Sequence, residues 1–461
     1  MKELFFLIRF IRELLICLKR QELTLALLGF LKKKKPHRAC VVGLDGVPHS
    51  LVLRLTAEGV MPFLGGMVKA GAGQKMKVTL PEISAVSWPS FMTGQNPGVH
   101  GIFGFTELGP GYKLRFTNFT NLKCPTLWDK LGERGKRSVV INQPGTYPAR
   151  AIPGAMISGF VAVELNKSVA PLKWLATLRR ANYEIDIDTQ RCRKDHNQLF
   201  LELKRTTDGR RAVIDVLWKE EDWDFFQAVI TGTDRLQHYL MAAVDDKSHP
   251  RHAQAMEYYA NIDRFIKEMW ERYHSSAEVS REGEGFYLLS DHGFCVIKQE
   301  VNVNAWLRQE GYLKFENEPP KGYEEISADS RAFALDPGRI YIHLKGKYPK
   351  GCVEPGAAAE NLTREIADKL RTLCYHSENV IEMVRTRAEA YSGPEAKNGP
   401  DLVAVANHGY DLKAALGATE VFGRSDLTGM HTWDDAFFWS AQAQNPDLEI
   451  TQLAEIVTKT I

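Results

Sequence analysis

The chain has 461 residues, of which 44% are hydrophobic and 25% charged, a balance typical of a globular protein with a sizeable core. Its net charge of +2 at pH 7 gives no overall reason to expect a nucleic acid as partner. The seven cysteines include no Cys-x-x-Cys pair, which argues against a disulfide framework and a thiolate zinc cluster and favours a reduced, cytoplasmic setting.

Residues 1–37 differ from the rest of the chain. Basic residues interrupt the apolar ones there, and a short apolar stretch over 23–31 ends in four lysines, Lys32 to Lys35. This amphipathic, basic pattern does not suit a spanning helix, and it predicts that residues 1–35 contact an anionic membrane surface on the cytoplasmic side. Two alternatives stay open: a helix packed on the domain or on a second subunit, and an uncleaved export signal.

From Arg38 onward, apolar runs alternate with helical patterns, which indicates an α/β fold with a mostly parallel sheet and helices on both faces. The predicted strands are 39–44, 138–141, 225–231, 286–289 and 402–405, and the predicted helices are 125–133, 205–219, 252–273, 304–310 and 357–373. We expect one domain over 38–461, with a proline-rich insertion at about 144–203 that caps the site. A second irregular region, 317–355, surrounds a short predicted strand at 339–344.

Acidic and histidine side chains recur at the ends of these apolar runs. They are Asp45, Asp234, His238, Asp291, His292 and His431. Buried strands in α/β sheets carry ligands at their carboxyl ends, and a carboxylate near a core is costly unless it is paired or bound to metal. Taken singly, each residue could instead cap a helix or serve as a structural histidine. Their recurrence at four apolar segments predicts a metal site.

The segment 81–102 carries further motif residues: Ser84, Thr93-Gly94, Pro97 and His100-Gly101-Ile102. Together with Gly43-Leu44-Asp45-Gly46, Ser290-Asp291-His292-Gly293 and the other positions above, it resembles the type I phosphodiesterase/nucleotide pyrophosphatase family of the alkaline phosphatase superfamily. The resemblance covers about 38–461. It implies an alkaline-phosphatase-like fold and a metal-dependent phosphoesterase of the phosphodiesterase or pyrophosphatase type.

The resemblance also implies roles for single residues. Ser84 would attack phosphorus between two zinc ions, one bound by Asp45, Ser84, Asp291 and His292, and the other bound by Asp234, His238 and His431. Zinc binding would activate a hydroxyl that is otherwise too weakly acidic. These oxygen and nitrogen ligands suit zinc and are compatible with manganese or iron. Ser84 could instead cap a helix, Ser87 is a rival nucleophile, and His100 is expected to structure a turn.

The substrate is left open by one departure from the family pattern. Phe105 stands where nucleotide-cleaving members have an asparagine that contacts the phosphoryl oxygen, and Asn118 and Asn121 are candidates for that contact. A lipid-linked phosphoester therefore rivals a nucleotide. Sulfatase activity is disfavoured, because Ser84 is not followed by the x-Pro-x-Arg pattern. Two other functions stay open: a non-catalytic relative that binds a phosphorylated ligand at a membrane, and a phosphoryl transferase to an acceptor other than water.

Overall fold

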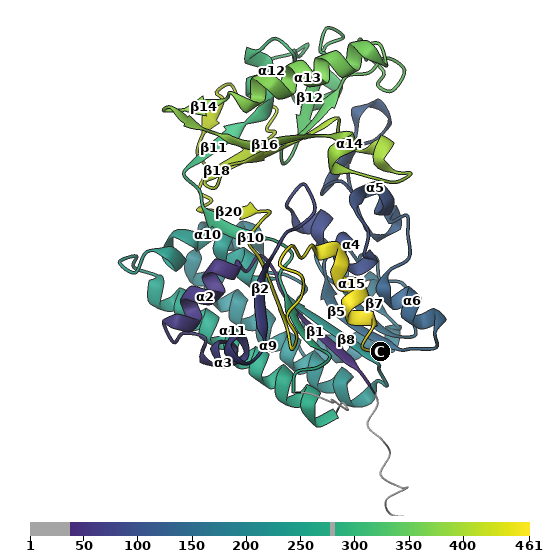
Figure 1. The fold of residues 1–461 in the computed structure, drawn as a ribbon, viewed down its shortest axis with the longest axis vertical. Coiled ribbons are helices and arrows are strands. Elements are labelled where there is room, and N and C mark those ends of the chain that lie inside the picture. The colour runs from purple at the N-terminus through teal and green to yellow at the C-terminus, as the bar shows by residue number, and fades with distance from the viewer. Residues whose placement is uncertain (1–36, 277–281) are drawn as a thin grey trace, which may run out of the picture.

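The computed structural model describes residues 37–276 and 282–461, which form a larger unit and a smaller unit (Figure 1). The larger unit holds an eight-stranded sheet, and the smaller unit is built mainly from residues 299–423. Residues 1–36, which hold nearly all of the predicted amphipathic basic segment, lie outside the described residues. The membrane contact expected for residues 1–35 therefore stays a prediction.

The main sheet has the strand order β2-β21-β9-β1-β8-β5-β6-β7. Its strands are β1 (Ala39–Leu44), β2 (Ala72–Met76), β5 (Ser138–Gln143), β6 (Gly154–Ser158), β7 (Val169–Ala170), β8 (Phe225–Ile230), β9 (Phe286–Leu289) and β21 (Ala436–Ser440). The five strands from β9 to β6 in this order run parallel, while β2, β21 and β7 pair antiparallel. The predicted α/β class with a mostly parallel sheet is confirmed.

The register of the central strands decides where the predicted ligands lie. Leu44 of β1 pairs with Ile230 of β8, and Gly43 pairs with Leu289 of β9. All three strands are buried along their whole length. Because parallel strands in register end at one edge of a sheet, the residues that follow β1, β8 and β9 meet there.

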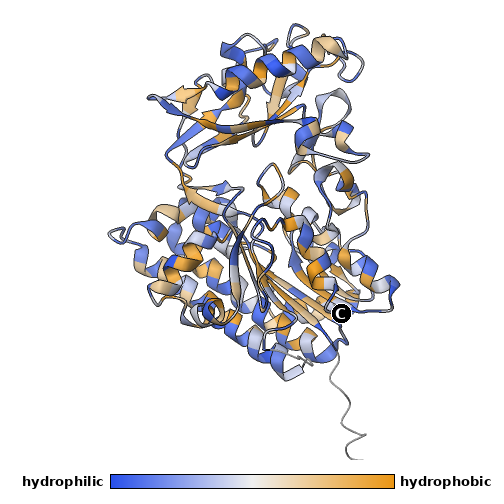
Figure 2. Ribbon diagram, viewed as in Figure 1, coloured by the Kyte–Doolittle hydropathy of each residue, from blue (hydrophilic) through white to orange (hydrophobic). Residues whose placement is uncertain are grey.

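Helices cover both faces of the main sheet, because alternate side chains of each strand enter opposite cores. Cys40 and Leu44 belong to one hydrophobic cluster and Val41 to another. The first cluster is covered by α2 (His49–Ala57), α3 (Pro62–Ala70), α9 (His196–Glu220), α10 (Gly232–Asp245) and α11 (His252–Ser276), and the second by α4 (Ser84–Thr93), α6 (Leu127–Glu133) and α15 (Leu453–Thr458). Figure 2 shows hydrophobic strands lying between these helices.

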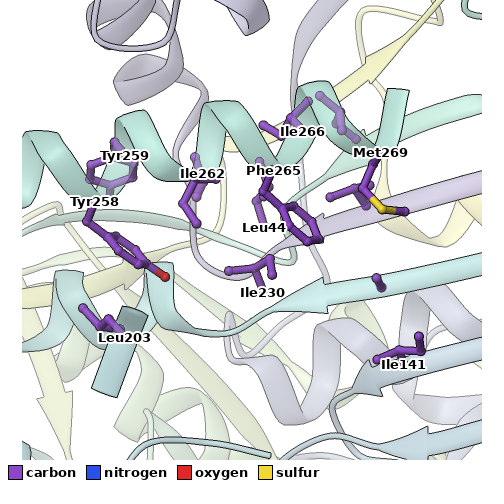
Figure 3. Close-up of a cluster of buried hydrophobic side chains, with 14 of the residues drawn as sticks. Leu44, Ile141, Leu203, Ile230, Tyr258, Tyr259, Ile262, Phe265, Ile266 and Met269 are labelled. Atoms are coloured by element: carbon purple, nitrogen blue, oxygen red, sulfur yellow. The ribbon is translucent and has the colours of Figure 1, made fainter. Parts of the chain in front are cut away.

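The core beneath α11 offers a direct test of this packing. Figure 3 shows Ile262 and Phe265 of α11 directed at Leu44 and Ile230 of the sheet. We expect Ile262→Ala to lower the free energy of unfolding by about 2–5 kcal/mol, since a fully buried side chain leaves a cavity. Urea unfolding followed by circular dichroism measures the change. Leu201→Ala, at a side chain 60% exposed on α9, should change it by less than about 0.5 kcal/mol; equal losses in the two variants would contradict this packing.

The smaller unit has its own hydrophobic core and its own sheets. Its main sheet is antiparallel, in the order β12 (Ala332–Leu335), β13 (Arg339–Ile342), β17 (Leu402–Ala406) and β16 (Ile381–Thr386). It also contains β11 (Gln299–Asn302), β18 (Tyr410–Lys413), β19 (Phe422–Gly423), β14 (Cys374–Tyr375), β15 (Glu378–Asn379), α12 (Val303–Gln309), α13 (Ala357–Arg371) and α14 (Arg387–Ala390). The strand predicted at 402–405 is thus β17, outside the parallel sheet.

Two small antiparallel pairs lie where the units approach each other. β10 (Gly293–Val296) pairs with β20 (Gly429–Thr432), and Figure 1 shows both between the units. The hairpin of β3 (Thr106–Leu108) and β4 (Leu114–Phe116) follows the short helix α5 (Pro97–His100). Tyr112, at the turn of this hairpin, joins the core of the smaller unit.

The segment 144–203, predicted as an inserted cap, contributes to the larger unit. It holds β6 and β7 of the main sheet together with α7 (Leu175–Arg180) and α8 (Thr189–Lys194). Trp174 and Leu178 belong to the core under the sheet. Its role as a cap over the site, and the single domain over 38–461, stay predictions.

Membrane-spanning potential is limited among the helices that the structure describes. None of them alone is both long and apolar enough to cross a membrane. Only α2 and α3 together, bent by 111° relative to each other, reach that length and apolarity.

Candidate metal centre

All seven predicted metal and nucleophile positions come together at the carboxyl edge of the main sheet. Asp45 follows β1, Asp291 and His292 follow β9, Asp234 and His238 lie on α10 directly after β8, Ser84 begins α4, and His431 lies in β20. Asp45, Asp291 and His292 are fully buried, and Ser84 is 2% exposed. Residues far apart in the sequence thus form one polar cluster inside the larger unit.

One half of this cluster surrounds the hydroxyl of Ser84. Its Oγ donates to Asp45 Oδ1 at 3.3 Å and lies 3.1 Å from His292 Nε2. The same His292 nitrogen is 3.3 Å from Asp291 Oδ2. Ser84 is the first residue of α4, and Ile83 occupies the capping position, so the hydroxyl faces the acidic cluster instead of capping the helix.

The other half is centred on Asp234. Its Oδ1 lies 3.4 Å from His238 Nε2 and 3.3 Å from His431 Nε2. The two histidine nitrogens are 3.0 Å apart. The halves touch, since the rings of His292 and His431 stack with centroids 3.7 Å apart. Two sets of ligand atoms could each hold an ion, Asp45 with Asp291 and His292, and Asp234 with His292 and His431, so His292 is common to both in this geometry.

Each of the three histidines is oriented by a backbone carbonyl. The Nδ1 atoms lie 3.3 Å from Gly429 O in His238, 3.1 Å from Gly293 O in His292 and 3.0 Å from Glu82 O in His431. A proton on Nδ1 that donates to a carbonyl leaves Nε2 with a free lone pair, which is the usual arrangement in metal-binding histidines. All three Nε2 atoms point into the centre, so cations there would meet nitrogen ligands.

The two oxygens of each of the three carboxylates have different surroundings. One oxygen of each is held by the protein: Trp88 Nε1 donates to Asp45 Oδ2 at 3.2 Å, Gly46 N to Asp291 Oδ1 at 3.0 Å, and Arg235 NH1 to Asp234 Oδ2 at 2.9 Å. Within the described residues, Asp234 Oδ1 and Asp291 Oδ2 are buried without a hydrogen-bond partner. Buried polar atoms are rarely left unpaired, so these two oxygens fit metal ligation.

The electrostatics of the centre also favour cations. Burial raises the pKa of Asp45 well above its ordinary value, and the charges of Asp291 and Asp234 add to this rise. Burial raises the pKa of Asp291 to about 6. Burial, followed by the nearby His431, lowers the pKa of His292 well below its ordinary value and keeps the ring neutral. Clustered carboxylates repel one another in a buried site, and divalent cations would relieve that repulsion.

Other predicted positions play local roles. The hydroxyl of Ser87 is buried and has no hydrogen-bond partner among the described residues. His100 Nε2 lies 3.0 Å from Ser90 Oγ, and its Nδ1 accepts from Ile102 N, which ties the end of α4 to α5. Asn118 and Asn121 use their side-chain oxygens in a capping box around the turn Phe119–Asn121. A contact with a phosphoryl oxygen would use the amide nitrogens, which take no part in this capping box, so that contact stays a prediction.

Sequence reasoning missed Trp88 and Arg235, which orient two of the carboxylates. Arg235 also pairs with Asp186, with Nε 3.0 Å from Oδ2. Arg235 directly follows Asp234 in the sequence, but nothing in that adjacency shows that its side chain turns back onto Asp234.

Arg235 should therefore tune metal retention. We expect Arg235→Gln to weaken metal affinity about 10- to 100-fold, as removal of a group that orients a metal ligand usually does. Competition with a fluorescent zinc chelator measures the affinity. Arg211→Gln is the matched control, because Arg211 is an ion-paired arginine of α9 that bonds Glu268 and Asn261. An unchanged affinity in Arg235→Gln would contradict the orienting role.

Comparisons with known proteins agree with this fold. The model of the type I phosphodiesterase/nucleotide pyrophosphatase family matches residues 39–434. None of the curated protein sequences matches the chain significantly. Among solved structures, phosphonoacetate hydrolase from Sinorhizobium meliloti 1021, in complex with phosphonoacetate, is 16% identical with a TM-score of 0.60, covering 93% of this chain and 96% of that one.

Two further structures have the same fold. Alkaline phosphatase PafA is 13% identical with a TM-score of 0.56, covering 92% of this chain and 96% of its own. Murine ectonucleotide pyrophosphatase/phosphodiesterase 5 is 12% identical with a TM-score of 0.52, covering 92% and 94%. The alkaline-phosphatase-like fold and the family expected from the motifs are confirmed. The chain belongs to the type I phosphodiesterase/nucleotide pyrophosphatase family and is a hydrolase of phosphoric ester bonds.

Proposed function

We propose that the protein is a two-metal phosphodiesterase in which Ser84 is the nucleophile. One observation carries this proposal: Ser84 Oγ lies at the first residue of α4 among three carboxylates and three imidazoles with ligand atoms turned inward. Asp45, Ser84, Asp291 and His292 would hold one zinc ion, and Asp234, His238 and His431 the other. This division follows the family resemblance and the two halves of the cluster.

The zinc ions would lower the pKa of the serine hydroxyl and neutralise negative charge on the phosphoryl group. The residues of the chain do the positioning. The first N–H groups of α4 lack intrahelical acceptors and favour a phosphoryl oxygen beside Ser84. Trp88 and Gly46 hold Asp45 and Asp291 in place by their hydrogen bonds.

In the proposed reaction Ser84 Oγ forms a bond to phosphorus as the bond to the leaving alcohol breaks. The proton of the hydroxyl passes to solvent, and the leaving oxygen takes up a proton. Water then cleaves the seryl phosphoester and restores Ser84. Attack through a covalent intermediate divides one difficult displacement into two easier ones.

A crystal structure with anomalous data at the zinc edge tests the proposal. The expected result is two peaks about 4 Å apart on either side of Ser84 Oγ, as in other two-metal sites. Manganese or iron edges would identify a different metal at the same positions. Peaks elsewhere, or a metal-free protein that binds phosphate without turnover, would overturn the proposal in favour of a non-catalytic relative. Analysis of products in the presence of alcohol acceptors separates hydrolysis from phosphoryl transfer.

A further inference from the structure

An apolar cluster lies directly beside the proposed nucleophile. Ile83 and Ala85, which flank Ser84 in the sequence, form a small hydrophobic cluster with Val86, and Phe105 packs against it. This cluster is separate from the two large cores of the larger unit. The ring of Phe105 is only partly buried, so it is not simply a core side chain.

A second aromatic ring connects this cluster to the other half of the metal centre. The rings of Phe105 and Phe160 lie with centroids 6.1 Å apart. The guanidinium of Arg235 lies 4.6 Å from the centre of the Phe160 ring, and the same guanidinium binds Asp234. Phe105 thus lies near Ser84 through Ile83 and Ala85, and Phe160, which is 7% exposed, lies near Asp234 through Arg235.

The chain after Phe160 continues this apolar character to the surface. Val161 is 48% exposed and Val163 is 80% exposed. Phe105 offers a bound phosphoester no hydrogen-bond donor, whereas an apolar ester group would gain from contact with the two rings. Burial of an apolar group contributes about 25 cal/mol for each Å² removed from water.

We propose that Phe105 and Phe160 bind an apolar alkyl or aryl group esterified to the phosphate of the substrate. This inference rests on the proposed function, since it places the phosphate beside Ser84. It names the substrate class as a phosphodiester with one apolar ester group next to phosphorus. A strongly polar group without an aromatic face would lose hydrogen bonds to water at that position without gaining partners from the two rings.

A chain-length series tests the inference. The substrates are p-nitrophenyl methyl, butyl and octyl phosphate, with p-nitrophenyl phenyl phosphate to separate alkyl from aryl preference. We expect kcat/KM to rise about two- to fourfold for each added methylene until the rings are covered. Phe105→Ala and Phe160→Ala should flatten this rise, and Phe105→Leu should keep most of it. A series with equal kcat/KM in the wild-type protein, or a slope unchanged in both alanine variants, would refute the inference.

The matched control is Phe315→Ala. Phe315 is a partly buried phenylalanine of the smaller unit with the guanidinium of Arg308 5.7 Å from its ring centre. It should leave the slope unchanged; a slope flattened equally by this variant would count against a local role for the aromatic pair.

Binding of methyl-, butyl- and octylphosphonate, measured by calorimetry on the metal-loaded protein, distinguishes failure of the proposed function from failure of the apolar site. If octylphosphonate binds more tightly than methylphosphonate through Phe105 but no diester is hydrolysed, the proposed function fails and the apolar site stands. If the diesters are hydrolysed at rates independent of chain length, and affinity is also independent of it, the function stands and the apolar site fails.

Discussion

Replacement of Ser84 by alanine should abolish hydrolysis of bis(p-nitrophenyl) phosphate, with kcat falling about 10³-fold or more. The expected size reflects the loss of the proposed attacking hydroxyl, since removal of a catalytic nucleophile leaves only the contributions of binding and charge. Steady-state kinetics measures the effect, and circular dichroism checks that the variant is folded.

Ser87→Ala is the internal control for this result. Ser87 lies one turn further along α4, is buried, and has no side-chain hydrogen bond among the described residues. Its removal should leave kcat near that of the wild-type protein. Activity retained in Ser84→Ala and lost in Ser87→Ala would identify Ser87 as the nucleophile in place of Ser84.

Removal of metal should abolish activity and also destabilise the protein. Asp45, Asp234 and Asp291 converge in a buried site, so a chelator leaves their charges unscreened and leaves Asp234 Oδ1 and Asp291 Oδ2 unpaired. A ligand that binds only the folded state at about 1,000 times its dissociation constant stabilises by roughly 4 kcal/mol, so the melting temperature should fall by several degrees on dialysis against EDTA. Added zinc should restore both activity and stability.

Single ligand variants sharpen this second prediction. His431→Ala should lower the metal content from about two equivalents per chain to about one, because only Asp234 and His238 would remain as ligands of the second ion. Inductively coupled plasma mass spectrometry measures the metal content. His100→Ala is the control, since His100 bonds Ser90 and Ile102 rather than the centre. A melting temperature and metal content unaffected by EDTA and by His431→Ala would argue against a resident metal.

Much of the larger unit could be predicted because its signals are local. The runs 39–44, 225–231 and 286–289 are mostly apolar, which is how strands buried on both faces appear in a sequence. The structure places them as β1, β8 and β9, side by side. The edge strand β2 was not predicted, because its residues Ala72–Met76 are mostly half-exposed and carry no apolar run.

The smaller unit shows where such local patterns fail. The apolar run at 402–405 looks like a parallel strand, yet β17 pairs antiparallel with β13 and β16. A strand buried on both faces has the same composition in either kind of sheet, so pairing direction depends on chain connectivity. The same limit applies to 144–203, where the proline-rich sequence showed no sign of β6, which pairs parallel with β5 in the main sheet.

The sequence alone predicted the strands that precede Asp45, Asp234 and Asp291, the seven candidate site positions and the family, because each depends on residue type and order along the chain. Only the tertiary structure decided which oxygen of each carboxylate is held by Trp88 or Arg235, that His292 stacks on His431, and that Phe105 meets Phe160. Apart from Asp234 and Arg235, which are adjacent, those contacts join residues that lie tens to more than a hundred positions apart. Their geometry follows from strand register and helix packing, which no local pattern encodes.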